Sequence, residues 1–368
     1  MKKQVLLSCG MPFDNKGGIQ KGVQLRTKLL CSEFDLDLLL FHPVEETVLR
    51  NEFPHIRSFY YFEDRKDIGK LDNCRRLYRF ADSFFDQHEY DTVHCHDTRI
   101  GGIVLAAAKK HKITTRVLSA HSSKILVKNQ TVIQQLFIYI TTKNALRNAN
   151  RLIGVSRIAC DDVFGKRKDT KVFYNGIDLS IFDKSKYPKD DTKDTIDFVH
   201  VGRFTPQKNH KFIIDTFNLI KTRFPNIRLT LIGYGPLEED IKKQISDLQL
   251  NNCIAMLPPD TYVPEAMGKA DYMIFPSLFE GLSNVAMEAM SMNVMCFGSD
   301  CLTREIETLG LWKALPLSAG PKGWAEYICG FMEEHKNNRP TVNEEELAKF
   351  DVKNTVKRYA DLYNGLEI

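Results

Sequence analysis

The sequence predicts an α/β protein built of two doubly wound domains with a cleft between them. Short apolar runs alternate with amphipathic stretches along the whole chain, and this alternation is typical of βαβ units. The apolar runs are nearly continuous, as expected when helices cover both faces of a parallel sheet. The 368 residues are also long for one domain and natural for two.

The first domain is expected over residues 1–182. Its predicted strands are Gln4–Cys9, Asp37–Phe41, Thr92–His96, Thr115–Ser119, Arg151–Val155 and Lys171–Tyr174. The amphipathic stretches between them predict helices, among them Leu71–Phe85, Ile100–His111 and Val132–Asn148.

A polar stretch at residues 183–194 interrupts this alternation and predicts a linker, since it holds almost no large apolar residue besides Tyr187. The second domain is expected over residues 195–350. Residues 351–368 are expected to form a final helix that packs back toward the first domain. The strands predicted in the second domain are Ile196–Val201, Ile227–Ile232, Tyr272–Phe275 and Val294–Phe297.

The net charge, the cysteine pattern and the length of the apolar runs limit the classes of protein to which the chain can belong. A net charge of +4 is too weak to indicate nucleic acid as a partner. The nine cysteines are scattered, which favours a reduced, cytoplasmic protein. No apolar run approaches the ~20 residues of a membrane helix. Two basic clusters (Arg75, Arg76 and Arg79, and Lys109, Lys110 and Lys112) fit solvated helix faces, or alternatively a patch that meets anionic lipid headgroups.

The most informative segment is residues 280–290, which read Glu-Gly-Leu-Ser-Asn-Val-Ala-Met-Glu-Ala-Met. Glu280 follows a predicted strand, and Glu288 stands two turns into the next predicted helix. The helix N-terminus between them presents free N–H groups and a favourable dipole to an anion. Two carboxylates beside such a site suit hydroxyl groups. For Glu288 the alternative is a structural hydrogen bond to the backbone, because a carboxylate near a buried face needs a partner.

A second informative segment, residues 202–209, follows the first strand of the second domain. Arg203 offers a bidentate fork and Lys208 a mobile point charge, and no acidic residue lies between them. This pair fits a diphosphate. The alternative, two solvated cations at a helix start, would oppose the helix dipole. A ligand with phosphates in the middle and hydroxyls at both ends is a nucleotide sugar.

Two glycine motifs are weaker signals. Gly233-Tyr234-Gly235-Pro236 resembles the start of a dinucleotide fingerprint, but Glu238 stands where a third glycine is required, which argues against a nicotinamide dehydrogenase. Gly17-Gly18 follows the first predicted strand and either lets the backbone approach a ligand or turns the chain.

Histidines close two predicted strands. His94 and His96 project to one face, but a third ligand of suitable spacing is missing, so no metal site is expected. His121 follows another strand end, where ligands bind in such folds. A structural role for His121 fits equally well.

Taken together, these segments resemble the signature of retaining glycosyltransferases of family 4 (glycosyl transferases group 1), whose GT-B fold has two Rossmann-like domains. In the second domain the matching segments are Gly202-Arg203, Lys208-Asn209, Gly233-x-Gly235-Pro236, and residues 276–290 with seven residues between the two glutamates. In the first domain the matching positions are Gly17-Gly18, His121, Gly154-Val155-Ser156 and Asn175-Gly176-Ile177-Asp178.

The resemblance implies a role for each matching position. Arg203 and Lys208 would hold the donor diphosphate, Glu280 would contact the transferred sugar, and His121 would lie near the reacting sugar. The donor-binding positions would be Gly18, Gly202, Gly235, Leu282, Ser283 and Glu288, with Glu288 on the ribose hydroxyls. Gly17 and Lys21 would lie on the acceptor side.

The implied activity is transfer of a sugar from a nucleoside-diphosphate sugar, expected to be a UDP-sugar, to a hydroxyl of a glycan or polyprenyl-linked acceptor. Neither a cofactor nor a metal is expected. The implied setting is bacterial envelope polysaccharide biosynthesis by a cytoplasmic protein, either free or in peripheral contact with an anionic membrane. Two alternatives stay open: another GT-B enzyme acting on nucleotide sugars, such as an epimerase or a hydrolase, and a non-catalytic protein that binds a nucleotide sugar or a glycan.

Overall fold

The computed structural model describes residues 2–9, 18–63, 69–121, 131–189 and 195–366. The chain divides into two compact units. Unit 1 consists of residues 1–176 and 352–368, and unit 2 of residues 177–351. The division precedes the boundary expected at residue 182, and the last helix belongs to unit 1. Residues 190–194 of the expected linker lie outside the described part of the chain.

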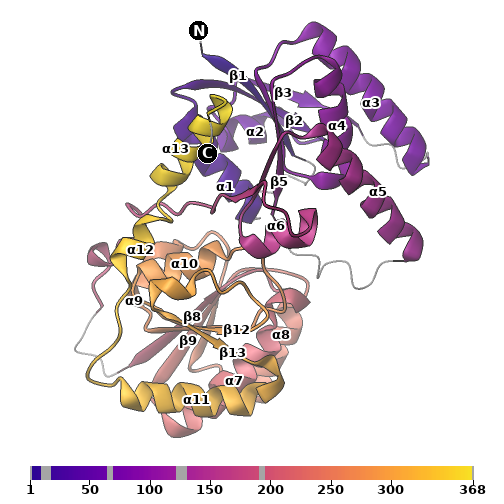
Figure 1. Ribbon diagram of the computed structural model, residues 1–368. Coiled ribbons are helices and arrows are strands. Elements are labelled where there is room, and N and C mark those ends of the chain that lie inside the picture. Colours follow the sequence, from indigo (N-terminus) through magenta and orange to yellow (C-terminus); the bar gives the residue numbers. More distant parts are fainter. Residues whose placement is uncertain (1, 10–17, 64–68, 122–130, 190–194, 367–368) are drawn as a thin grey trace. The chain divides into compact units, whose positions relative to one another are not determined.

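Unit 1 is built on a parallel sheet, which has seven strands within its described residues (Figure 1). In sheet order the strands are β3 (Ser58–Tyr61), β2 (Phe34–Leu40), β1 (Lys3–Cys9), β4 (Thr92–Cys95), β5 (Thr115–Ala120), β6 (Arg151–Gly154) and β7 (Thr170–Val172). Every strand predicted in the first half overlaps an observed one. The strand β3 was not predicted from the sequence, because this edge strand is only four residues long and lacks the buried apolar run of the others.

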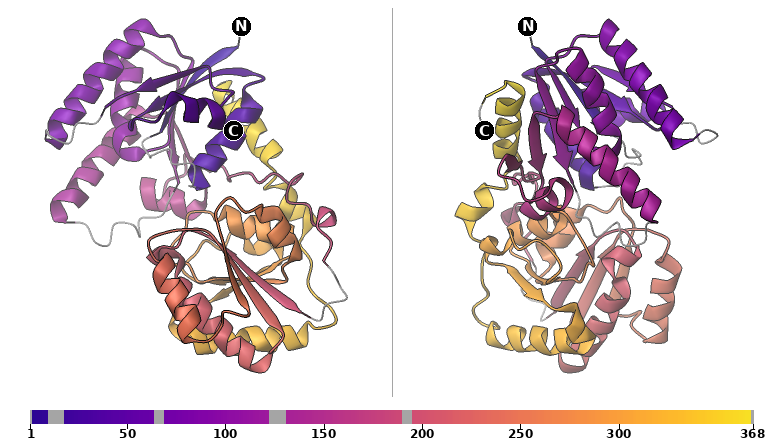
Figure 2. Two further views of the ribbon diagram at one scale, coloured as in Figure 1. Left: turned by 180° about the vertical axis from the view of Figure 1, so that it is seen from behind. Right: turned by 45° about the vertical axis from the view of Figure 1, so that its right-hand side comes forward.

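Helices cover both faces of this sheet (Figures 1 and 2). On one face α1 (Gly18–Leu30) packs against α13 (Val352–Tyr363). On the other face α4 (Thr98–Lys110) packs between α3 (Lys70–Gln87) and α5 (Val132–Asn148). Two shorter helices are α2 (Glu46–Glu52) and α6 (Arg157–Phe164). The apolar core under α1 includes side chains of β1, β2 and α13, so the last helix is part of that core.

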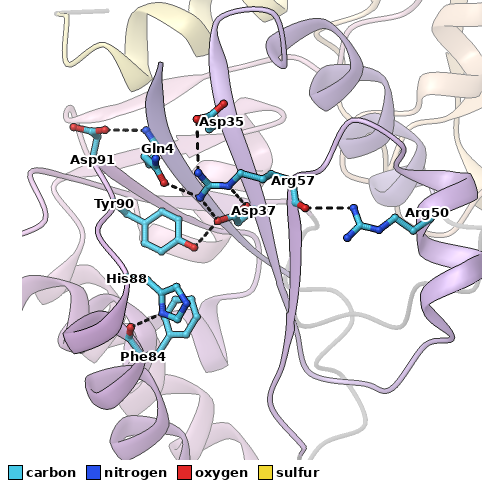
Figure 3. A network of polar contacts seen from close by, with 9 residues as sticks. All are labelled: Gln4, Asp35, Asp37, Arg50, Arg57, Phe84, His88, Tyr90 and Asp91. Atoms are coloured by element: carbon cyan, nitrogen blue, oxygen red, sulfur yellow. Dashed lines mark hydrogen bonds and ion pairs between the residues drawn. The ribbon is translucent and has the colours of Figure 1, made fainter. Parts of the chain in front are cut away.

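A network around the buried Asp37 carboxylate of β2 joins this strand to the segments that precede β3 and β4 (Figure 3). The Arg57 guanidinium donates to both Asp37 oxygens, at 3.0 Å from Nε and 2.6 Å from Nη2. The Tyr90 hydroxyl donates a third hydrogen bond at 2.7 Å. The hydrogen bond with Asp37 is the main cause that raises the pKa of Arg57 above its ordinary range. The buried charge is therefore fully partnered, as stability requires.

Unit 2 is built on a second parallel sheet, which has six strands within its described residues. In sheet order they are β10 (Ile254–Leu257), β9 (Ile227–Ile232), β8 (Ile196–Val201), β11 (Tyr272–Phe275), β12 (Met295–Ser299) and β13 (Trp312–Leu315). Its helices are α7 (His210–Arg223), α8 (Glu238–Asp247), α9 (Val263–Lys269), α10 (Asn284–Ser291), α11 (Gly320–Glu334) and α12 (Glu344–Ala348). The strands β10 and β13 were not predicted from the sequence, because each is only four residues long and contains partly exposed residues.

The strand order of unit 2 creates a topological switch point. β8 lies between β9 and β11, so the connections that leave β8 and β11 cross to opposite faces of the sheet. Such a divergence opens a crevice beyond the carboxyl ends of the two strands, where ligands of open α/β sheets bind. The segments 202–209 and 276–283 leave the sheet at this point. The two-sheet α/β architecture predicted from the sequence is confirmed.

Removal of the Arg57 guanidinium should destabilise unit 1. Arg57→Met leaves the buried Asp37 carboxylate with only the Tyr90 hydroxyl. Loss of a buried charge's partner costs about 3 kcal/mol when both groups are buried, and we expect roughly 1–3 kcal/mol here because the Arg57 side chain is 42% exposed. Arg75→Met is the matched control, since Arg75 pairs with Asp72 on the exposed surface of α3 and such a pair is worth roughly 0.5 kcal/mol. Urea unfolding followed by circular dichroism measures both. Equal stability of the two variants would contradict the role given to Asp37.

Candidate active site

The loops that follow β8 and β11 are joined to each other by hydrogen bonds. The Gln207 side chain donates to the Phe279 carbonyl at 2.8 Å, and the Leu278 backbone N–H donates to the Gln207 carbonyl at 2.9 Å. Asn209 Nδ2 donates to the Pro276 carbonyl at 3.4 Å. These contacts hold the 202–209 and 276–280 segments together at the switch point, although they lie far apart in the sequence.

An ion pair connects the same two loops. Lys208 Nζ lies 2.6 Å from Glu280 Oε1, and the two side chains are only 15% and 14% exposed. Lys208 Nζ also lies 5.1 Å from the centre of the Phe275 ring, over its face. The sequence offered no acidic neighbour for Lys208, because its partner comes from the other loop. Two predicted site residues are therefore in direct contact.

Arg203 supplies a second cation beside this pair. Its side chain is exposed, and its guanidinium carbon lies 5.6 Å from the centre of the Tyr234 ring. Tyr234 belongs to the loop after β9. The Tyr234 carbonyl accepts a hydrogen bond from the Phe204 N–H at 2.7 Å. Within the described residues no carboxylate forms an ion pair with Arg203, so its charge is available to an anion.

Glycine is required in the loop after β9. A Cβ on Gly233 would lie 2.1 Å from the Gly202 carbonyl oxygen, and one on Gly235 would lie 2.5 Å from the Phe204 carbonyl oxygen. Both contacts are with backbone, which cannot rotate away. Two of the predicted donor-binding positions, Gly202 and Gly235, therefore lie where the loop after β8 packs against the loop after β9.

The N-terminus of α10 is the third part of the candidate site, beside Arg203 and the Lys208–Glu280 pair. Ser283 is the N-cap, and its Oγ accepts from the Ala286 N–H at 3.3 Å. Leu282 and Ser283 are both buried. Asn284, which the sequence analysis did not select, has a buried Oδ1 with no hydrogen-bond partner among the described residues. Only the fold could reveal this burial. The helix start presents N–H groups and a positive dipole end, which suit an anion.

Glu288 lies on the second turn of α10 and is half-buried. Its backbone carbonyl accepts from the Ser291 hydroxyl at 2.8 Å. The helix separates it from Glu280, which precedes the N-cap. The two carboxylates thus come from a loop and a helix, as the sequence analysis expected.

Two buried histidines support the 202–208 loop from inside the unit. The His200 and His210 rings meet edge to face, with centres 4.9 Å apart. Burial is the main cause that lowers both pKa values, with Lys208 adding to the effect, and the pKa of His210 falls to about 4. Within the described residues, both His210 nitrogens and His200 Nε2 lack hydrogen-bond partners. Both rings are therefore neutral below the cationic loop.

The histidines singled out in unit 1 lie at the carboxyl ends of β4 and β5. His96 Nδ1 lies 2.9 Å from His121 Nε2, and burial lowers the pKa of His121 to about 3. His94 is occupied on both nitrogens, by the Tyr363 hydroxyl at 2.7 Å and the Ser119 hydroxyl at 2.5 Å. Among the described residues no group of three or more His, Cys, Asp or Glu is arranged to hold a metal ion.

The remaining predicted positions of unit 1 are on or before α1. Gly18 is the first residue of α1, and Lys21 is exposed on its first turn. Gly17 lies outside the described residues. The roles predicted for Gly17, Gly18, Lys21 and His121 stay predictions.

Family models match both halves of the chain. Residues 24–181 match the model described as Glycosyltransferase Family 4, and residues 182–336 match the model described as Glycosyl transferases group 1. Together they cover well over half of the chain. The protein is a family 4 glycosyltransferase.

Relatives and solved structures agree with this assignment. The glycosyltransferase is 22% identical over 363 residues to the capsular polysaccharide biosynthesis glycosyltransferase CapH of Staphylococcus aureus, covering 95% of this chain and 96% of CapH. It is 22% identical over 312 residues to the UDP-Gal:alpha-D-GlcNAc-diphosphoundecaprenol alpha-1,3-galactosyltransferase of Escherichia coli, covering 78% of each. The crystal structure of Anabaena Alr3699/HepE in complex with UDP shares its fold, with a TM-score of 0.77 at 18% identity and full coverage of both chains.

The buried histidine pair should make stability depend on pH. His210 keeps a pKa of about 4 in the folded glycosyltransferase, against an ordinary value of 6.5. The unfolded chain therefore binds a proton between these values that the folded chain does not, so stability falls as pH falls through this window. From pH 7 to pH 5, His210 alone should cost on the order of 1–2 kcal/mol.

Urea unfolding at pH 7 and pH 5 checks this prediction. His210→Leu should lose less stability than the parent protein over this range. Thr216→Val, a buried and non-titrating change in the same helix, should leave the pH dependence unchanged. An unchanged pH dependence in His210→Leu would show that the ring is not held neutral.

Proposed function

We propose that this glycosyltransferase transfers a sugar from a UDP-sugar to a hydroxyl of a glycan or lipid-linked acceptor, with retention of the anomeric configuration. The observation that carries the proposal is the cluster at the switch point of unit 2. There the exposed Arg203, the Lys208–Glu280 pair and the start of α10 converge from two loops that hydrogen bonds join.

The diphosphate would lie against Arg203, Lys208 and the α10 N-terminus. Lys208 has three N–H donors and uses one on Glu280, so it can bind a phosphate oxygen without leaving its partner. Arg203 contributes a charge that no carboxylate of the described residues neutralises. Preorganised donors of this kind stabilise the negative charge that develops on a departing nucleoside diphosphate.

The two carboxylates would bind opposite ends of the donor. Glu280, fixed by Lys208 beside the phosphate position, would accept hydrogen bonds from hydroxyls of the transferred sugar. Glu288, on the second turn of α10, would accept from the ribose hydroxyls. The ion pair keeps Glu280 oriented, which favours a positioning role over that of a nucleophile.

The reaction needs little further acid–base chemistry. The acceptor hydroxyl would attack the anomeric carbon from the face that the diphosphate leaves. Its proton would pass to the departing phosphate oxygen, so that one C–O bond forms as the other breaks and the configuration is retained. Arg203 and Lys208 would neutralise the negative charge of the departing diphosphate, a task that a metal ion often performs. Independence from metal stays a prediction.

The acceptor and the setting rest on the relatives. The Escherichia coli relative is named for a UDP-Gal donor and a diphosphoundecaprenol-linked acceptor, and CapH is named for capsular polysaccharide biosynthesis. We therefore propose a step of bacterial envelope polysaccharide biosynthesis on a lipid carrier, at the cytoplasmic face of the membrane. Among the helices that the structure describes, none combines the length and apolar character that crossing a bilayer requires.

Arg203→Ala should lower turnover by about 10²–10³-fold, as removal of one preorganised donor does in other enzymes. Because the Arg203 side chain is exposed, the fold should tolerate the change. Arg228→Ala is the matched control, because Arg228 is an exposed arginine of β9 away from the cluster. Near-normal transfer by purified Arg203→Ala would refute the assignment. Free sugar or an altered donor formed without acceptor would instead indicate a hydrolase or an epimerase.

A panel of nucleotide sugars should identify the donor by thermal shift. A donor present at a hundredfold excess over its Kd should raise the melting temperature by about 5 °C. We expect UDP-sugars to do so and guanosine and adenosine diphosphate sugars to have little effect. Glu288→Gln should reduce the shift caused by UDP alone. Glu280→Gln should remove the additional shift caused by the sugar and, because it breaks the pair with Lys208, also lower the melting temperature of the unliganded protein. A larger shift with a purine donor would overturn the choice of UDP.

A further inference from the structure

One helix of unit 1 exposes an apolar stripe. Leu136, Tyr139 and Ile140 of α5 are 57%, 59% and 57% exposed. Their spacing of three and four residues places them on one face of the helix. Lys143 and Arg147 continue the same face toward the C-terminus, and both are exposed. Surface helices of globular proteins normally turn such an apolar stripe toward the core.

The orientation of α5 is fixed from its other face. A Cβ on Gly102 of α4 would lie 2.8 Å from the Ala145 backbone nitrogen, so the two helices touch through backbone at this point. The Asn144 side chain donates to the Gly102 carbonyl at 3.1 Å, and Thr141 and Ala145 are buried. The helix cannot rotate to bury Leu136, Tyr139 and Ile140 without losing this contact.

Positive charge accompanies the stripe. The sequence of α5 contains no acidic residue. Lys143 Nζ lies 5.4 Å from the centre of the Tyr139 ring, and Lys70 Nζ of α3 lies 5.7 Å from the centre of the Phe137 ring. Next to Lys70 the Leu71 side chain is 63% exposed. The start of α3 thus extends the combination of apolar and basic side chains to a second helix.

We propose that this face, Leu136, Tyr139, Ile140, Lys143 and Arg147 of α5 with Lys70 and Leu71 of α3, docks on an anionic lipid bilayer. Aliphatic side chains enter the acyl boundary, tyrosine sits at headgroup level, and lysine and arginine meet anionic headgroups. The absence of acidic residues from the sequence of α5 favours an anionic lipid surface. The biological purpose rests on the lipid-linked acceptor of the proposed function, but the docking itself needs neither donor nor acceptor.

Vesicle sedimentation without nucleotide or acceptor tests the docking. The parent protein should bind vesicles of phosphatidylglycerol and phosphatidylcholine in equal parts, with binding that weakens as salt rises, and should bind phosphatidylcholine vesicles weakly. The triple variant Leu136→Ser, Tyr139→Ser, Ile140→Ser and the double variant Lys143→Glu, Arg147→Glu should each lose at least about tenfold in affinity. Leu219→Ser, which removes an exposed leucine of α7 in unit 2, should bind like the parent.

The controls separate this inference from the proposed function. Arg203→Ala should sediment with vesicles like the parent, while the triple serine variant should keep parental melting temperature and donor-induced thermal shift. Equal vesicle binding by parent and triple variant would overturn the docking face. A parent protein that forms dimers without vesicles, and becomes monomeric in the triple variant, would assign the stripe to a second copy and also overturn it.

Discussion

The ion pair between Lys208 and Glu280 is the interaction on which the candidate site depends. It links the loops after β8 and β11, which leave the sheet of unit 2 toward opposite faces, and it lies at the point where they diverge. Both side chains are largely buried, so each charge relies on the other for compensation, and loss of either partner would leave an unpaired buried charge. The pair thereby fixes a carboxylate and an ammonium group beside the start of α10 before any ligand arrives.

Several features around the pair follow from this constraint. The loop after β9 can lie against the loop after β8 only because Gly233 and Gly235 have no Cβ to meet the backbone of Gly202 and Phe204. The buried rings of His200 and His210 lie near enough to Lys208 for its charge to help lower their pKa values, and they stay neutral, so they add no positive charge beneath it. Arg203 remains exposed at the rim. The neutral histidines in the interior and the exposed Arg203, which no carboxylate of the described residues pairs, together suit an anionic ligand that enters from solvent.

Much of the fold, and several residues of the candidate site, could be predicted from the sequence. The alternation of apolar runs and amphipathic stretches predicted the parallel α/β sheets, because buried parallel strands must be apolar on both faces. The edge strands β3, β10 and β13 escaped prediction, since each is four residues long and partly exposed. Glu280, Arg203 and Lys208 could be selected because strand ends and helix starts are recognisable in sequence. Asn284 could not, because its lack of a hydrogen-bond partner depends on burial that no local pattern encodes.

The sequence by itself determined the α/β class, the family and the residue types that gather at the strand ends. Those properties depend on local periodicity and on spacing within short segments. Only the tertiary structure decided that Lys208 pairs with Glu280, that His94 is occupied by Tyr363 and Ser119, and that α5 turns Leu136, Tyr139 and Ile140 outward. Each of these involves groups from segments far apart in the chain, or a helix rotation set by packing against a neighbour. Such contacts arise from three-dimensional packing, which the order of residues does not display.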